Sequence, residues 1–373
     1  INYNGEQLVG TGENGTRAVE LDNIPSDVLS SMEVQKTLLP SNDGDAIGGV
    51  INLRSAEARS LTPKFKIDAG PGYNFLRDKT MYNGKFSYEQ RFHPTEANPH
   101  GVFGVAARLS YFNSYTGYDR LDANNWLLKS VKMFDGSKED IYMPTDFRYR
   151  YLTQHSKRAG ASFVLDYAPS LNTKIVWTGS YNTQDISATR NRNRERFRGS
   201  FWQLDPAKYG DNAYATDRVT EAVQYTPTDE TKTTINTALN AETAFGNWKI
   251  DAGVSYSYSV NDYKSMAYGF FTPDYRANNK VINGTGNPAM QFPKNTQVGY
   301  VPDITSNYLT LGYLAETNGA TAGSAFNDPE DFALTTVERW DHKQTGQNIT
   351  GHLNTSWNHN IGDAAATLSF GIK

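Results

Sequence analysis

Apolar and polar residues alternate along most of this chain. The clearest case is WKIDAGVSYSYSVN, residues 248–261, in which apolar or aromatic side chains hold every second position and mostly polar ones lie between them. Because successive side chains of a β-strand point to opposite faces, the alternation predicts a strand with one apolar and one polar face. The same pattern recurs from residue 63 onward and predicts nine strands. They cover residues 65–75, 82–92, 103–111, 159–167, 175–181, 235–245, 248–260, 349–357 and 366–372.

The connections between these strands differ in length. Four are compact, at residues 93–101, 167–172, 246–247 and 358–364. Apart from a short first connection around residues 77–80, we expect the others to be long loops, near 115–147, 190–220 and 269–336. Aromatic residues stand beside the compact turns: Phe92, Tyr167, Phe245, Trp248 and Trp357.

Two kinds of all-β fold alternate in this way, a soluble β-sandwich or propeller and a transmembrane antiparallel β-barrel. The predicted apolar faces are rich in Ala, Gly and aromatic rings rather than in the Val, Ile and Leu of a core between two sheets. A transmembrane barrel also has short periplasmic turns, long outer loops and aromatic girdles at the membrane interfaces. The pattern therefore favours the barrel. No run of about 18 apolar residues predicts a transmembrane helix.

Composition and charge exclude some classes of function. The net charge of −4 argues against a general nucleic-acid-binding protein. The absence of Cys excludes disulfides and thiolate metal sites. No HExxH, P-loop or GxSxG motif occurs, so we expect no enzymatic activity, no cofactor and no metal site. The chain does not begin with Met and stops within an alternating stretch, so we expect it to be an internal piece of a longer protein.

Residues 17–55, RAVELDNIPSDVLSSMEVQKTLLPSNDGDAIGGVINLRS, carry the most specific motif of the chain. They resemble the end of the plug domain of TonB-dependent outer-membrane receptors, and look most like the large receptor group common in Caulobacter and Xanthomonas. The resemblance implies that residues 1–55 are the C-terminal part of a plug and residues 56–63 a linker. Residues 64–373 would be the first part of a transmembrane barrel of about 22 strands, which they resemble in pattern rather than in motif.

The resemblance also implies a function. Such receptors lie in the cell outer membrane of Gram-negative bacteria, bind a scarce solute such as a ferric siderophore or an oligosaccharide, and import it into the periplasm. The implied partners are TonB, through a box preceding residue 1, outer-membrane lipid and lipopolysaccharide, the solute, in some cases a surface lipoprotein, and no nucleic acid. The alternatives are a passive porin or adhesin barrel without TonB coupling, and a soluble carbohydrate-binding or sugar-active β protein.

Two segments of the plug are candidate sites. Gly48 and Gly49, which form the end motif of the plug together with Arg54, permit close backbone approach, as a strand pressed against a barrel wall requires. An ordinary β-bulge is the alternative for the glycine pair. Residues 9–17, VGTGENGTR, are expected to form an apical loop exposed to ligand, unless they are a flexible tip without function. Its candidate residues are Gly10, Thr11, Glu13, Asn14 and Arg17.

Five arginines alternate in TRNRNRERFR, residues 189–198. On an unbroken strand they share one face with the polar positions 178–184, so they are expected to face the lumen near its outer mouth. Guanidinium groups in a row repel one another and need anions. Carboxylates of the plug or loops, an anionic ligand, or lipopolysaccharide phosphate could supply them, and the last requires a bulge that turns the row outward. The candidates are Arg190, Arg192, Arg194, Arg196 and Arg198.

Aromatic residues in the expected outer loops are the second set of ligand-binding candidates. Sugars and aromatic siderophores stack on exposed rings, whereas local packing within a large loop is the structural alternative. The candidates are Trp126, Trp202, Tyr209 and Tyr214, together with Phe201.

Overall fold

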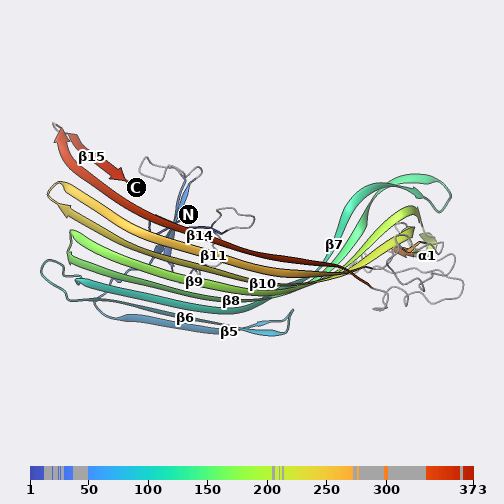
Figure 1. Cartoon of the computed structure of the whole chain (residues 1–373), viewed down its shortest axis with the longest axis horizontal. Helices are drawn as coiled ribbons and strands as arrows, with labels where there is room; N and C mark the ends of the chain where they lie inside the picture. The colour runs from blue at the N-terminus through green and yellow to red at the C-terminus, as the bar shows by residue number, and fades with distance from the viewer. Residues whose placement is uncertain are drawn as a thin grey trace.

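The chain folds almost entirely into β-strands that form two sheets (Figure 1). The computed structural model describes residues 1–11, 19, 24, 26, 29–36, 49–203, 206–209, 211, 214–271, 275–276, 298–300, 333–361 and 364–373. Within these residues the helical structure is one short helix, α1 (Pro206–Tyr209). No helix of the described residues is long and apolar enough to cross a membrane.

The large sheet confirms the nine predicted strands. They pair antiparallel with their neighbours in chain order, and two short strands, β12 (Tyr275–Arg276) and β13 (Val298–Tyr300), pair with β10. Among the described residues β5 pairs only with β6, and β15 only with β14, so both are edge strands. The nine strands are β5 (Lys64–Asn74), β6 (Lys79–Phe92), β7 (Phe103–Lys132), β8 (Lys138–Ser170), β9 (Thr173–Gln203), β10 (Tyr214–Phe245), β11 (Trp248–Phe271), β14 (Ala333–Ile361) and β15 (Ala364–Ile372).

The expectation of long loops near 115–147 and 190–220 is wrong. Strands β7 and β8 stay paired from Phe103 opposite Tyr167 to Lys132 opposite Lys138, and β9 and β10 are likewise paired through most of the second segment. Strict alternation is lost there because apolar residues such as Leu127 and Leu128 stand side by side, yet backbone pairing does not require an alternating pattern. Most of the third segment, 269–336, lies outside the described residues.

The compact turns lie together at one end of the sheet (left in Figure 1). Aromatic residues face one another across the strands at this end, as predicted. The rings of Phe103 and Tyr167 lie 5.0 Å apart, and those of Trp248 and Trp357 are stacked at 5.9 Å. The sheet therefore carries aromatic pairs along the edge where its strands turn.

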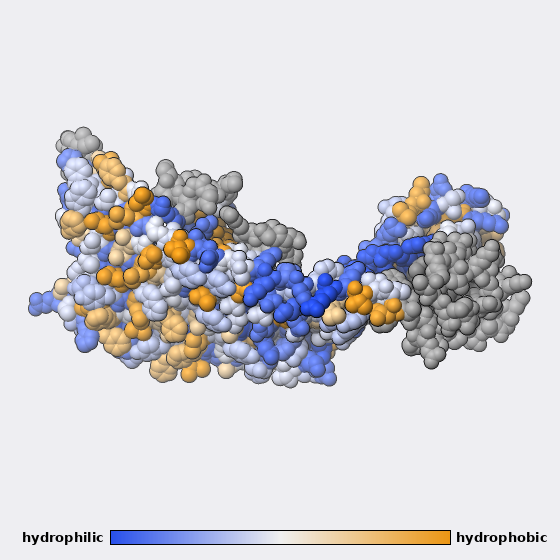
Figure 2. Space-filling model, viewed as in Figure 1, coloured by the Kyte–Doolittle hydropathy of each residue, from blue (hydrophilic) through white to orange (hydrophobic). Residues whose placement is uncertain are grey.

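The two faces of the sheet reverse the usual distribution of apolar and polar residues. One face exposes large apolar side chains, and Figure 2 shows apolar residues gathered over the part of the molecule near the compact turns. On β7 the exposed large apolar residues are Phe103, Leu109 and Tyr111, and further along the strand Trp126, Leu127 and Leu128. Examples on other strands are Phe65, Ile67, Phe86, Phe163, Leu165, Trp177, Leu239, Val254 and Leu353. The opposite face buries polar side chains: Thr178, Ser180, Asn182, Gln184, Thr234, Asn236, Ser255, Ser257, Ser259 and Asn261.

The N-terminal residues form a separate small sheet. Its strands are ordered β2-β1-β4-β3, around a core of Tyr3, Leu8, Ile24 and Leu53. Residues 56–63 connect it to the large sheet without regular secondary structure. The strands are β1 (Asn2–Tyr3), β2 (Glu6–Gln7), β3 (Leu29–Gln35) and β4 (Val50–Ser55).

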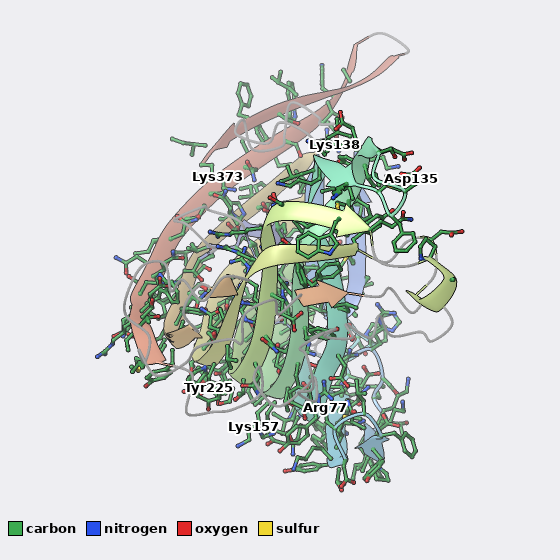
Figure 3. All side chains as sticks on the ribbon, turned by 90° about the vertical axis from the view of Figure 1, so that its right-hand side faces the viewer. Arg77, Asp135, Lys138, Lys157, Tyr225 and Lys373 are labelled. Atoms are coloured by element: carbon green, nitrogen blue, oxygen red, sulfur yellow. The ribbon has the colours of Figure 1, made fainter. Side chains whose placement is uncertain are left out.

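The small sheet lies against the polar face of the large sheet. The Val9 backbone N–H donates to Ser257 Oγ at 3.2 Å, and the Ser255 hydroxyl donates to Glu6 Oε2 at 3.2 Å. The large sheet is curved, with Lys373 beside one edge and Arg77 near the other (Figure 3). Polar groups of one sheet thus satisfy polar groups of the other, and among the described residues nothing covers the apolar face.

Candidate functional site

The predicted arginine row lies on the polar face of β9. The pairing of β9 with β8 is continuous between residues 175 and 196, and its only shift from β10 falls between Thr216 and Arg218. The arginines at 190–198 therefore share the face of Asn182 and Gln184, as the sequence predicts. No bulge turns the row toward the apolar face, so the geometry disfavours contact with lipopolysaccharide.

Neighbouring strands add arginines to this row. Arg148 of β8 is opposite Arg194, and Arg150 is opposite Arg192. Arg120 of β7 is opposite Arg150. We call this surface the arginine face; it comprises Arg120, Arg148, Arg150, Arg190, Arg192, Arg194, Arg196 and Arg198, with Asp122 and Asp146.

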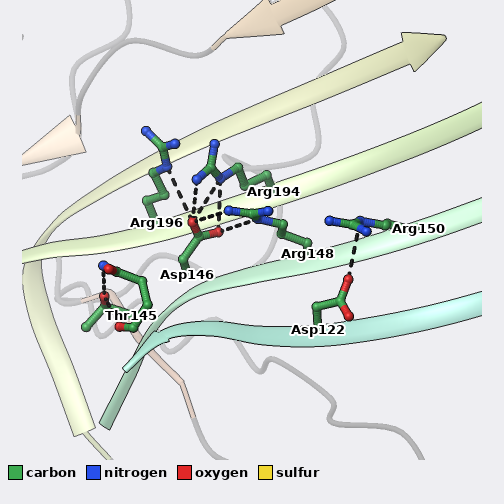
Figure 4. Close-up of polar contacts among 8 residues, drawn as sticks. Asp122, Thr145, Asp146, Arg148, Arg150, Arg194 and Arg196 are labelled. Atoms are coloured by element: carbon green, nitrogen blue, oxygen red, sulfur yellow. Dashed lines mark hydrogen bonds and ion pairs between the residues drawn. The ribbon is translucent and has the colours of Figure 1, made fainter. Parts of the chain in front are cut away.

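Asp146 neutralises one end of the arginine face (Figure 4). Arg194 Nε donates to its carboxylate at 2.9 and 3.1 Å, and Arg148 donates through Nε at 3.1 Å and Nη2 at 3.0 Å. Arg196 adds an ion pair at 3.7 Å. Burial raises the pKa of the Asp146 carboxyl, but the hydrogen bonds and charges of Arg194 and Arg148 outweigh it and hold that pKa well below its usual range. Asp146 is therefore ionised at neutral pH.

Asp122 neutralises a second part of the face. Arg150 Nε lies 3.3 Å from its carboxylate, and Arg120 contacts the same group. These two carboxylates lie on the neighbouring strands β7 and β8, not in the plug or in a loop, as the structural explanation of the arginine row expected. They account for Arg194 and Arg196, but not for Arg190 and Arg192.

Arg190 and Arg192 have no counter-ion among the described residues. Their Nε atoms are buried and have no hydrogen-bond partner in the described part of the chain. Burial, followed by the charges of Arg194 and Arg190, lowers the pKa of Arg192 to about 10. The guanidinium of Arg192 remains charged at neutral pH but is held in an unfavourable electrostatic environment.

Strand β10 lines the same region with two neutral polar residues. Gln224 is opposite Arg192 and Thr226 is opposite Arg190. The Gln224 Oε1 and Thr226 Oγ1 atoms are also buried without a hydrogen-bond partner among the described residues, and Thr226 is only 6% exposed. Because native structures leave few buried polar atoms unpaired, this group requires an explanation.

The aromatic candidates do not form one platform. Trp126 is 47% exposed and stacks on Tyr142, with ring centroids 5.7 Å apart. Phe201 and Tyr214 are buried, so they serve packing. Trp202, at the end of β9, is half-buried and pairs with Lys132 of β7. Tyr209 lies in α1, and its side chain is outside the described residues.

The plug candidates are described only in part. Gly10 and Thr11 lie against the large sheet, and the Thr11 and Ser259 hydroxyls are hydrogen bonded at 3.2 Å. Arg54 pairs with Glu33 at 2.7 Å on the exposed surface of the small sheet. Four candidates fall outside the described residues: Glu13, Asn14, Arg17 and Gly48.

Gly49 confirms the expected close approach, but with a different neighbour. Its φ is +143°, and an added Cβ would lie 2.7 Å from the backbone oxygen of Gln35. The close contact is therefore with β3 of the same small sheet, not with the wall of the large sheet. Strand β4 needs glycine there because β3 comes within van der Waals distance.

Sequence reasoning missed the contribution of β8. Arg148 and Arg150 alternate within FRYRY just as the arginines of β9 do, but they lie between the loop expected near 115–147 and the strand expected from residue 159, and were assigned to neither. The link between Glu6 and His352, whose Nδ1 lies 3.0 Å from Glu6 Oε1, joins residues 346 positions apart and has no local signal. No protein-family model matches the chain, and no curated protein sequence matches it significantly.

Proposed function

We propose that this chain is part of a transmembrane β-barrel receptor of the outer membrane, in which the small sheet belongs to a plug and the large sheet to the barrel wall. In this role it binds a scarce solute on its polar face and imports it with energy from TonB. The process is binding coupled to displacement of the plug, not bond chemistry.

The reversed distribution of apolar and polar residues carries this proposal. A soluble sheet exposing Phe65, Ile67 and Phe163 to water would forgo roughly 1.5–3 kcal/mol for each such side chain left unburied. Lipid removes that cost. The alternating apolar stretch predicted for β7, residues 103–111, is nine residues long, and a tilted strand needs about 9–11 residues to cross the hydrocarbon core. Aromatic pairs at the turns match an interfacial girdle.

The contacts of the small sheet support a plug that can move. They are mainly polar: Glu6 with Ser255 and His352, Val9 with Ser257, and Thr11 with Ser259. Each such hydrogen bond contributes only about 0.5–1.5 kcal/mol net, because water can replace the partner. Pulling can therefore break these contacts one after another without exposing an apolar interface.

Fractionation of source cells tests the membrane assignment. We expect the protein in the outer-membrane fraction, released only by detergent. Recovery from the membrane-free fraction would refute the barrel and favour a soluble carbohydrate-binding protein. Coupling is tested by deleting TonB: uptake of the solute should stop, whereas uptake that survives would identify a passive porin.

A crosslink tests displacement of the small sheet. The chain has no natural Cys, so Val9→Cys with Ser257→Cys provides one unique pair for a short thiol-reactive crosslinker. Crosslinking should abolish uptake while leaving solute binding intact. The matched control joins Trp248→Cys to Trp357→Cys within the large sheet, where a link should not affect uptake. Equal uptake by the Val9–Ser257 crosslinked protein would contradict plug displacement.

One observation favours an oligosaccharide as the solute. The exposed Trp126–Tyr142 pair offers a stacking surface at the end of the β7–β8 hairpin. Induction of the protein by a glycan, and loss of glycan binding in Trp126→Ala, would support this solute. Induction by iron starvation instead would favour a ferric chelate.

A further inference from the structure

The unpaired part of the arginine face lies on three adjacent strands. Arg150 of β8, Arg192 of β9 and Gln224 of β10 stand directly opposite one another, and Thr226 is opposite Arg190 in the next row of the same face. Neighbouring strands are about 4.8 Å apart, and alternate residues on one strand are about 7 Å apart. The distances between the donors in this row therefore match the distance between two oxyanion groups of one small molecule.

The charge balance of this surface is incomplete within the described residues. Asp146 and Asp122 occupy the guanidinium groups of Arg194, Arg148, Arg150 and Arg120. Arg190 and Arg192 retain no carboxylate partner there, and their buried Nε atoms lack acceptors. Adjacent like charges on paired strands destabilise a sheet unless an anion lies between them. A bound anion would supply both the missing charge and the missing acceptors.

We propose that Arg190 and Arg192, with Gln224 and Thr226, form a binding site for a small polyanion carrying two or more carboxylate or phosphate groups. Binding of the polyanion does not depend on the proposed function. Only the role of the site, which is to hold the imported solute, rests on that function. Arg side chains suit this role because the planar guanidinium donates two parallel hydrogen bonds to an oxyanion. The Thr226 hydroxyl adds a neutral donor. The unpaired atom of Gln224 is its acceptor Oε1, so the amide must turn over for its NH₂ group to donate to the anion.

Calorimetric titration of the detergent-solubilised full-length protein tests the site, with citrate as the carboxylate probe and pyrophosphate as the phosphate probe. We expect one or both to bind, more weakly at high ionic strength. Arg190→Gln with Arg192→Gln should weaken binding by at least about tenfold. Arg192→Lys keeps the charge but loses the paired donors, so its effect should be intermediate. The matched control is Lys157→Gln, which removes an exposed positive charge on the opposite face of β8. This variant should bind the probes as tightly as the wild type.

Two results would overturn the site. One is that neither probe binds to the wild type while the arginine variants lose stability, because carboxylates elsewhere in the chain then occupy these arginines. The other is that the Arg190→Gln, Arg192→Gln variant binds as tightly as the Lys157→Gln control. This test and the transport experiment can fail independently. A receptor for a neutral solute would lose uptake without TonB and still not bind a polyanion. A passive pore could bind a polyanion and still not need TonB.

Discussion

Asp146 stabilises the arginine-rich end of β8, where its carboxylate is the shared partner of several guanidinium groups. Its carboxylate is almost fully buried and is shared by three guanidinium groups, of Arg148, Arg194 and Arg196. A buried charge is tolerated only when such partners satisfy it. Removing the carboxylate would leave several arginines facing one another across two strands without an anion.

Asp146→Asn should therefore destabilise the pairing of β8 with β9 by roughly 3–5 kcal/mol at neutral pH. Hydrogen exchange of residues 138–148 measures the effect as faster exchange. Asp140→Asn, an exposed carboxylate on the same hairpin, is the control and should change exchange little. Exchange at wild-type rates in the Asp146 variant would show that the ion pairs contribute nothing.

The same carboxylate predicts a pH dependence. Its pKa is lower in the folded protein than the ordinary value of about 4, so its stabilisation is complete above that pH and is lost as the pH falls below it. The stability difference between wild type and Asp146→Asn should therefore shrink below about pH 4. Exchange corrected for the intrinsic pH effect measures it. A difference that stays constant down to pH 2 would contradict the assignment.

Gly49 is a second residue whose identity the backbone dictates. Gly49→Ala should destabilise the small sheet by at least about 1–3 kcal/mol, because φ is positive and the new Cβ meets the Gln35 carbonyl oxygen. Proteolysis of the N-terminal sheet reports the loss. Gly5→Ala provides a control with positive φ but open space around the added Cβ, so its effect should be smaller. Equal effects would mean that the close approach to β3 is unimportant.

Among the elements, the small sheet is held to the large one by few groups. Glu6 is central, because it accepts a hydrogen bond from Ser255 and pairs with His352, which also contacts Asp251 at 3.0 Å through Nε2. Its side chain is buried between the two sheets. Other polar groups add to it, since Arg108 Nη1 donates to the backbone oxygen of Leu29 at 2.7 Å.

Glu6→Ala should loosen this attachment by about 1–3 kcal/mol, since it leaves polar partners on β11 and β14 unpaired. Protease cleavage within residues 56–63 should become faster. Glu33→Ala removes an exposed carboxylate that pairs only with Arg54 of the small sheet, so it serves as the control. Cleavage that responds equally to both changes would place the attachment elsewhere.

At the scale of the whole molecule, the exposed apolar face of the large sheet predicts contact with lipid. Leu165→Lys places a charge in the exposed apolar stretch of β8, two residues from Tyr167 beside the compact turn. In lipid vesicles it should destabilise the fold by about 1–2 kcal/mol, between the costs at the interface and at the midplane. Asn191→Lys, exposed on β9 beyond that stretch, should have little effect. Urea unfolding in vesicles measures both. A Leu165 variant as stable as the Asn191 variant would show that this face does not meet lipid.

Local alternation was enough to predict the strands but not their ends. Nine strands, the compact turns and the shared face of Arg190–Arg198 were readable because side-chain direction in a strand depends only on the parity of position. The extensions of β7, β8 and β9 were missed because adjacent apolar residues such as Leu127 and Leu128, mixed with polar ones, interrupt the strict alternation there. There the cross-strand hydrogen bonds decide, and these depend on a partner strand.

The sequence by itself determined which residues share a face and that one face is apolar, and it showed that Gly48 and Gly49 permit a close approach of the backbone. Only the tertiary structure decided what those faces meet. It paired Asp146 with Arg194, placed Glu6 beside His352, and left Arg190 and Arg192 without a described counter-ion. The physical reason is distance along the chain: periodicity is a local property, whereas charge balance and hydrogen-bond satisfaction depend on residues that only folding brings together.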